Sequence, residues 1–164
     1  MPAADKVLPR DQLAARLRAG RKTHGKIVFT CGVFDLLHVG HVRYLEYARS
    51  LGGLLVVGVN SDESVRQLGK SPDRPIVGQA ERAELVAALE SVAYVCIFDE
   101  MRPIETIRIL RPDIHVKDAA YRSGVLPEAA MVEEVGGVVA FAPHVEGWST
   151  TKLAARLLPG GDRR

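Results

Sequence analysis

The sequence predicts an α/β fold: a doubly wound, parallel sheet of five strands with helices on both faces. Two observations support this prediction. Short apolar runs rich in branched residues alternate with helical stretches along the chain. These runs also lack the polar–apolar alternation of strands with one solvated face, so they suit parallel strands buried on both sides. Right-handed crossovers between such strands give a Rossmann-like architecture.

The individual elements follow from these runs and from the turn residues between them. The expected strands are 27–31, 54–59, 93–98, 114–116 and 138–141. The expected helices are 11–19, 40–51, 61–68, 79–90, 103–110, 126–135 and 149–158. Glycine pairs at 52–53 and 136–137 stop two of the helices just before the next strand. The stretch 69–78 is the longest irregular segment and is expected to be a mobile loop.

The length and composition predict one ordinary globular domain. The chain has 164 residues, 47% hydrophobic and 26% charged, within the range of a single core. We expect a core over 26–158, a helical extension over 1–25 and a flexible tail over 159–164. The two cysteines, Cys31 and Cys96, lie in apolar runs and suit small buried side chains in a reducing, cytoplasmic setting better than a disulfide.

Charge and hydropathy exclude two classes of partner. The net charge is +2, Lys and Arg are scattered, and only 5% of residues are aromatic, so no nucleic-acid surface is expected. No apolar run approaches the roughly 20 residues that span a bilayer, and the amino terminus lacks the apolar core of a signal peptide.

Polar residues gather where the expected strands end. They follow the first strand at 32–41, the second at 60–62, the fourth at 117–118 and the fifth at 144–151. In open α/β sheets, ligands bind beyond the carboxyl ends of the strands, at the switch in strand order. One binding cleft is therefore expected at this edge.

The stretch 32–41, GVFDLLHVGH, joins the first strand to a helix and has the features of an anion site. Gly32 and Gly40 allow the backbone to approach a ligand closely. The free N–H groups and the dipole at the helix start favour a phosphate. His38 and His41 are three residues apart at that start, so both imidazoles are expected to face one site.

These residues also fit other roles. The histidine pair resembles half of a zinc site, but no second Cys or His pair is present to complete it, so no protein metal site is expected. The two histidines also fit a structural role, and Asp35 fits a turn cap. The combination of glycines, Phe34, Asp35 and both histidines at fixed spacing favours the phosphate site.

The pattern G-x-F-D-x-x-H-x-G-H resembles the signature of the cytidylyltransferase-like nucleotidyltransferase superfamily. The stretch 148–151, WSTT, is similar to that superfamily's second signature. In this stretch Ser149 suits a helix N-cap, and Thr150 and Thr151 add donors to a second anion site. The resemblance covers about 26–158 of this sequence.

Within that superfamily the chain resembles the adenylyltransferases of bacterial heptose activation. The matching stretches include TCGVFDLLHVGHVRYLEYAR, VVGVNSDESVRQLGK and GWSTTKL. The resemblance implies AMP transfer from ATP to a heptose 1-phosphate, with Mg²⁺ accompanying the ATP, no covalent intermediate, and a homo-oligomer, a dimer. The alternatives are a cytidylyltransferase acting on a small phosphate or phosphonate, and a nucleotide-binding module without catalysis.

The resemblance also implies roles for individual residues. It makes His38, His41 and Lys70 the catalytic residues. It places the nucleotide against Gly32, Val33, Phe34, Asp35, His38, Gly40, His41, Lys117, Ser149, Thr150 and Thr151. It places the phosphorylated acceptor against Asp62, Lys70, Arg74, Arg82 and Asp118. For Arg82, a solvated helix face is the equal alternative. The family's usual Gly-Gly-Asp after Lys117 is replaced by Asp-Ala-Ala at 118–120, which leaves the acceptor open.

Overall fold

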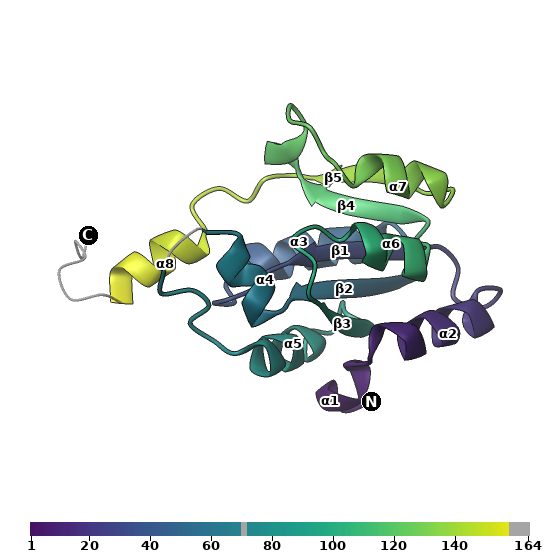
Figure 1. Ribbon diagram of the computed structural model, residues 1–164, viewed down its shortest axis with the longest axis horizontal. Helices are drawn as coiled ribbons and strands as arrows, with labels where there is room; N and C mark the ends of the chain where they lie inside the picture. The colour runs from purple at the N-terminus through teal and green to yellow at the C-terminus, as the bar shows by residue number, and fades with distance from the viewer. Residues whose placement is uncertain (70–71, 158–164) are drawn as a thin grey trace.

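The computed structural model describes residues 1–69 and 72–157, and it has the predicted architecture. Five strands form one parallel sheet with the order β3-β2-β1-β4-β5 (Figure 1). They are β1 (Ile27–Gly32), β2 (Leu54–Asn60), β3 (Tyr94–Phe98), β4 (Ile114–Asp118) and β5 (Val138–Ala142). The strand order reverses between β1 and β4, which makes the sheet doubly wound and confirms the predicted fold class.

The seven predicted helices are present in the predicted order, and the structure adds one short helix and a 3₁₀ turn. They are α1 (Ala3–Lys6), α2 (Arg10–Gly20), α3 (Val39–Ser50), α4 (Asp62–Gln67), α5 (Gln79–Ala87), α6 (Ile104–Leu110), α7 (Ala129–Glu134) and α8 (Thr150–Leu157), with a 3₁₀ turn η1 (Ala119–Tyr121). The short α1 was not predicted. The helix expected over 126–135 begins only at Ala129, because Pro127 and Glu128 form a turn before it.

The unpredicted amino-terminal segment covers the edge of the sheet. After α1, Val7 forms a parallel bridge with Val95 of β3, and the Leu8 N–H donates to the Val95 carbonyl at 2.9 Å. The Lys6 ammonium donates to the carbonyls of Ala87 and Val92, just beyond α5. These contacts occupy hydrogen-bonding groups of an edge strand that would otherwise be open to pairing with another chain.

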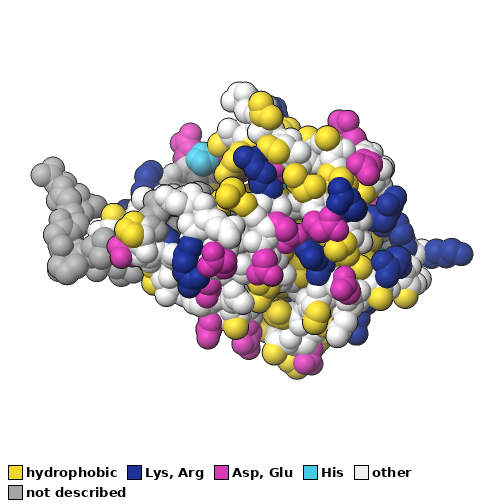
Figure 2. Space-filling model, in the orientation of Figure 1, with side chains coloured by type: hydrophobic (Ala, Val, Ile, Leu, Met, Phe, Trp, Pro, Cys, Tyr) yellow, Lys and Arg dark blue, Asp and Glu magenta, His cyan; other side chains and the backbone are white. Residues whose placement is uncertain are grey.

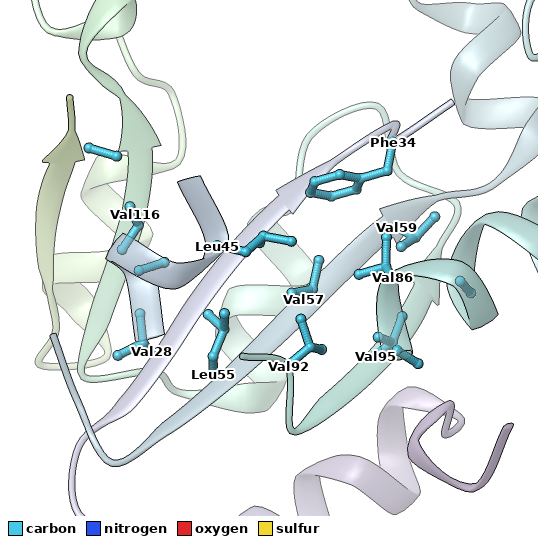
Figure 3. Packing of buried hydrophobic residues seen from close by; sticks show 14 of the residues in the cluster. Val28, Phe34, Leu45, Leu55, Val57, Val59, Val86, Val92, Val95 and Val116 are labelled. Carbon is cyan, nitrogen blue, oxygen red and sulfur yellow. The ribbon is translucent and has the colours of Figure 1, made fainter. Parts of the chain in front are cut away.

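The hydrophobic core has two layers, one on each face of the sheet. On one face α3 and α5 pack over the strands, with Leu45 and Val86 fully buried (Figure 3). On the other face α2, α6 and α7 cover a second cluster that includes Leu17 and Phe29. Full burial of such a side chain stabilises the fold by about 1.5–3 kcal/mol. The two layers fix the sheet and leave its carboxyl edge open.

The surface is mixed in charge. Acidic and basic side chains lie among one another over the middle of the face in Figure 2. Among the described residues, no helix has the length and apolar character needed to cross a membrane.

Candidate active site

A large cavity lies at the carboxyl edge of β1 and β4, where the sheet order reverses. Its volume is about 950 Å³, at the upper end of the range for small-molecule sites. It contains most of the residues that the sequence assigned to one cleft. Those that line it are Gly32, Val33, Phe34, Asp35, His38, Gly40, His41, Arg74, Lys117, Asp118, Ser149, Thr150 and Thr151.

The turn after β1 is shaped by Phe34. This residue has a φ of 51°, in the left-handed region that non-glycine residues adopt only when their surroundings hold them there. Its ring is 5% exposed and joins the end of the hydrophobic cluster beneath the turn (Figure 3). The ring also lies over Gly32, where an added Cβ would come within 3.1 Å of it. Phe34 therefore anchors the turn in the core.

The two histidines of the turn stack on each other at the start of α3. The centroids of the His38 and His41 rings are 3.9 Å apart, with 20° between the ring planes. The His41 ring also meets the edge of Phe34 at 5.2 Å. The Nδ1 atoms of both histidines are buried, and neither has a hydrogen-bond partner among the described residues. The expectation that both imidazoles face one site agrees with this geometry.

Both rings are uncharged at neutral pH. The pKa of His41 is lowered to about 4, mainly by burial and in smaller part by the neighbouring His38. Burial also lowers the pKa of His38. A neutral imidazole donates one hydrogen bond, so the pair offers two N–H donors rather than two positive charges. Such donors suit an anion whose charge increases during a reaction.

Gly40 provides the space that the stacked rings need. A Cβ at this position would lie 2.9 Å from the ring of His38 and 3.1 Å from Cβ of Trp148. Gly40 therefore lets the segment before α8 approach the start of α3. The Trp148 ring lies parallel to His38, with 6.1 Å between the ring centroids.

The start of α8 forms a second group of donors in the same cavity. The Ser149 Oγ accepts a hydrogen bond from the Lys152 N–H at 3.1 Å, so Ser149 is the N-cap that the sequence suggested. Ser149, Thr150 and Thr151 all line the cavity. Two helix N-termini, α3 and α8, thus meet at one cavity, and both favour an anion.

Asp35 holds the described part of the 69–78 loop that leads into α5. Its carboxylate accepts from Arg74 Nη1 at 2.7 Å and from the N–H groups of Ile76 and Val77 at 2.8 and 2.9 Å. Burial acts to raise the pKa of Asp35, but these donors outweigh it, and the pKa lies below its ordinary value. Both oxygens are occupied, so Asp35 fastens the loop to the β1 turn.

Arg82 and Asp62 lie outside the cavity, in contrast to the ligand contacts expected for them. The Arg82 side chain is fully buried on α5, so the alternative of a solvated helix face is wrong. Its guanidinium donates to the carbonyls of Val77 and Val33 at 2.9 and 2.6 Å and to Asp62 at 2.6 Å. We call Asp35, Asp62, Arg74 and Arg82 the arginine clamp. Lys70, expected on the same loop, lies outside the described residues.

The end of β4 contributes a charged cluster to the cavity. Lys117 lines the cavity and forms an ion pair with Glu128, at 3.2 Å. Asp118 contacts His144 Nδ1 at 3.1 Å and also accepts from the Ala120 N–H, so it joins the ends of β4 and β5. The sequence prediction missed Glu128. The signal for it was Lys117 itself, because a lysine at the end of a buried strand requires a counter-charge.

An apolar wall was also missed. Tyr121, Val145, Trp148, Ala154 and Ala155 line the same cavity as the histidine pair. Apolar side chains beside an anion site suit a nucleobase. The amphipathic pattern of 149–158 could have indicated these residues, because the apolar side of a helix packs against the rest of the protein or against a ligand. Cys31, expected to be buried, is half-buried and also lines the cavity.

A metal ion bound by the protein itself would need a group of side chains able to hold it. Within the described ranges, no group of three or more His, Cys, Asp and Glu side chains is arranged to hold an ion. The two oxygens of Asp35 are already engaged by the loop.

The cleft has two stacked histidines at the start of α3 and a capped Ser-Thr-Thr segment at the start of α8. The family model described as "Cytidylyltransferase-like" matches residues 29–156, which include both helix starts. The chain belongs to the cytidylyltransferase-like family. It is therefore a nucleotidyltransferase, as the two sequence motifs predicted.

Similar proteins extend the comparison. Two proteins named "Bifunctional protein HldE" are 49% identical over 151 residues, in Geotalea uraniireducens, and 47% identical over 153 residues, in Syntrophotalea carbinolica. These matches cover 92% and 93% of this chain but only 30% and 31% of the relatives. The chain thus spans less than a third of the length of the curated relatives that it matches.

A solved structure has the same fold. It is titled as the lipopolysaccharide core biosynthesis protein from Thermoplasma volcanium GSS1, and it is 28% identical with a TM-score of 0.61. The match covers 74% of this chain and 97% of that one.

Proposed function

We propose that this chain transfers AMP from MgATP to a heptose 1-phosphate and releases pyrophosphate. The observation that carries the proposal is the convergence of two helix N-termini and two uncharged histidines on one cavity of about 950 Å³. The triphosphate would bind at His38, His41 and Ser149, and the base would lie against the wall near Trp148. We also propose 26–158 as the catalytic core.

The acceptor would enter from a smaller neighbouring cavity. This cavity of about 270 Å³ shares Gly32, Val33 and Lys117 with the larger one. Arg102 lines it as well, so two cations face an acceptor that carries a phosphate. The shared wall is then the place where the acceptor phosphate meets the α-phosphorus of ATP.

The reaction needs no nucleophile from the protein. An oxygen of the acceptor phosphate forms a bond to the α-phosphorus, and the bond from that phosphorus to the bridging oxygen of the β-phosphate breaks. The leaving pyrophosphate keeps the bridging oxygen and its electron pair. The protein contributes orientation and N–H donors for the growing negative charge. Neutral histidines serve this purpose without binding the substrate's charge too tightly beforehand.

The comparisons support the choice of a sugar acceptor. The chain is similar to proteins named HldE, and the Thermoplasma protein is titled for lipopolysaccharide core biosynthesis, which requires activated sugars. The resemblance in the sequence to heptose adenylyltransferases extends from the β1 turn to α8.

The test is pyrophosphate release with a matrix of substrates. ATP and CTP are each combined with heptose 1-phosphate, glycerol 3-phosphate and a phosphonate, and the products are identified by mass spectrometry. We expect ADP-heptose as the main product. Turnover with CTP only would instead establish the cytidylyltransferase alternative. Binding of a nucleotide without turnover of any acceptor would identify a nucleotide-binding module.

A further inference from the structure

A row of three polar side chains runs from the core to the wall of the cavity at β4. His115 and Lys117 are two residues apart on the strand, so their side chains lie on the same face of the sheet. Glu128 lies over that face, just before α7. Its Oε1 atom is 3.6 Å from His115 Nε2 and 3.2 Å from Lys117 Nζ. The exposed fraction of the side chains rises along the row, from 0% at His115 to 5% at Glu128 and 15% at Lys117.

The glutamate and the lysine both remain charged. Burial acts to raise the pKa of Glu128, but His115, a backbone N–H and the Lys117 charge outweigh it and lower that pKa to about 2. Burial acts to lower the pKa of Lys117, and the charges of Cys31 and Glu128 outweigh it, so the pKa lies above its ordinary value. Glu128 and Lys117 thus form an ion pair near neutral pH, and the Glu128 carboxylate is buried.

Lys117 is held on two sides. Besides the contact with Glu128, its ammonium lies 4.7 Å from the centre of the Tyr121 ring, a cation–π distance. Lys117 and Tyr121 both line the larger and the smaller cavity. The ammonium therefore has a fixed place on the wall that the two cavities share.

We propose that Glu128 is a positioning residue for nucleotidyl transfer, which holds the Lys117 ammonium at the wall between the two cavities. The proposal rests on the proposed function, because that wall is where the acceptor phosphate would meet the α-phosphorus. The His115 ring lies on the core side of Glu128, with Nε2 3.6 Å from the carboxylate oxygen, and its bulk limits the movement of the carboxylate.

The physical reason is the mobility of lysine. Its ammonium is a point charge on a flexible stem, so a free lysine would follow the most negative group in reach, the β- and γ-phosphates of bound ATP. Holding the ammonium at the α-phosphorus instead weakens its contact with the ground state and keeps it where charge develops. Loss of the restraint should therefore lower kcat while the KM for ATP stays constant or falls.

The experiment compares three variants on the intact chain. Glu128→Gln keeps the shape and removes the charge, while Glu128→Asp keeps the charge and withdraws it by one methylene. Glu133→Gln, at an exposed position of α7, is the matched control. We expect kcat to fall about 10- to 100-fold in both Glu128 variants, without a rise in the KM for ATP, and to stay at the wild-type level in the control. A Glu128→Asp variant with wild-type kcat would overturn the proposal, because charge balance alone would then suffice.

A second measurement requires no turnover. Reductive ¹³C-methylation labels the lysines, and the Lys117→Arg spectrum assigns the Lys117 signal. We expect this signal to titrate at lower pH in Glu128→Gln than in the wild type and to shift further when ATP is added, because the freed ammonium moves toward the phosphates. Identical titration and identical ATP shifts in both proteins would overturn the proposal. A wild type without turnover on any substrate pair would refute the proposed function, and the labelled spectra would distinguish that result from a mobile Lys117.

Discussion

The histidine pair and the arginine clamp lie at the same turn after β1, and they differ in how their polar groups are satisfied. His38 and His41 have buried ring nitrogens without a partner among the described residues. In the clamp, Arg82 has all its donor nitrogens engaged and Asp35 has both oxygens engaged. Unpartnered buried ring nitrogens are costly, and beside a cavity they indicate a ligand, whereas a completed network indicates a structural role. Both groups were expected from the sequence to bind substrate, and the structure separates them.

The strongest test of this contrast is His41→Ala. Removing a donor aimed at developing charge should lower kcat by about 10²- to 10³-fold. The melting temperature should fall only by what the lost ring contacts with Phe34 and His38 contribute, because Nδ1 of His41 has no hydrogen-bond partner among the described residues. Kinetics of pyrophosphate release and thermal unfolding measure the two effects. The control is His24→Ala, a histidine outside the cavity. Activity within tenfold of wild type would remove His41 from the proposed chemistry.

Arg82→Met is expected to have the opposite profile. It leaves Asp62 and two carbonyls without their donor, and the loss of one partner from such a network should lower the free energy of unfolding by roughly 3 kcal/mol. Urea denaturation measures this change. Arg66→Met, which breaks an exposed pair with Glu63, should cost less than about 1 kcal/mol. If Arg82→Met kept full stability and raised the KM of the acceptor instead, Arg82 would be a ligand contact and the contrast would fail.

Part of the difference between the histidine pair and the arginine clamp could have been predicted from the sequence. Residues 82, 83, 86 and 87 share the buried face of α5, so helical periodicity could have indicated the burial of Arg82, which the sequence analysis did not predict. The strands and both helix starts were predictable because local apolar runs and cap residues encode them. The partners of Asp35 were not, because the Asp35–Arg74 pair joins segments 39 residues apart through a loop without periodicity. The same holds for Glu128, which only the need of Lys117 for a counter-charge could have indicated.

Gly40→Ala tests whether the stacked rings themselves matter. The new Cβ would lie 2.9 Å from the His38 ring, so the ring would have to move. A displacement of this size should lower kcat about 10- to 100-fold without removing any polar group. Gly124→Ala is the matched control, since a Cβ there would have its nearest neighbour at 3.7 Å. Equal activities of the two variants would show that the geometry of His38 is not critical.

Asp118→Asn tests the part of the cavity where this chain differs from the heptose adenylyltransferases it resembles. The contact of Asp118 with His144 is largely exposed, with side-chain exposures of 30% and 57%. Exposed pairs contribute about 0–1 kcal/mol, so the KM for ATP should rise less than about fivefold and stability should hardly change. Titration calorimetry with ATP and CTP measures the effect. A much larger loss for one nucleotide than for the other would make this pair a determinant of base specificity.

The smallest expected effect is that of pH on kcat/KM, which should be nearly constant around neutral pH. The value of kcat/KM reports the ionisation of the free enzyme, in which burial lowers the pKa of His41 to about 4 and also lowers that of His38. His41 is then deprotonated well below pH 6.5, the pKa of His38 also lies below its ordinary value, and Lys117, whose pKa is raised, keeps its charge well above pH 8. With saturating Mg²⁺, kcat/KM should therefore vary less than about threefold between pH 6.5 and 8.5. If an imidazolium ion with an ordinary pKa near 6.5 were required, kcat/KM would instead fall about tenfold for each pH unit above that value. Such a fall would mean that the histidines act as cations. The histidine pair and the arginine clamp would then both be charged groups, and the pair could no longer be described as neutral donors.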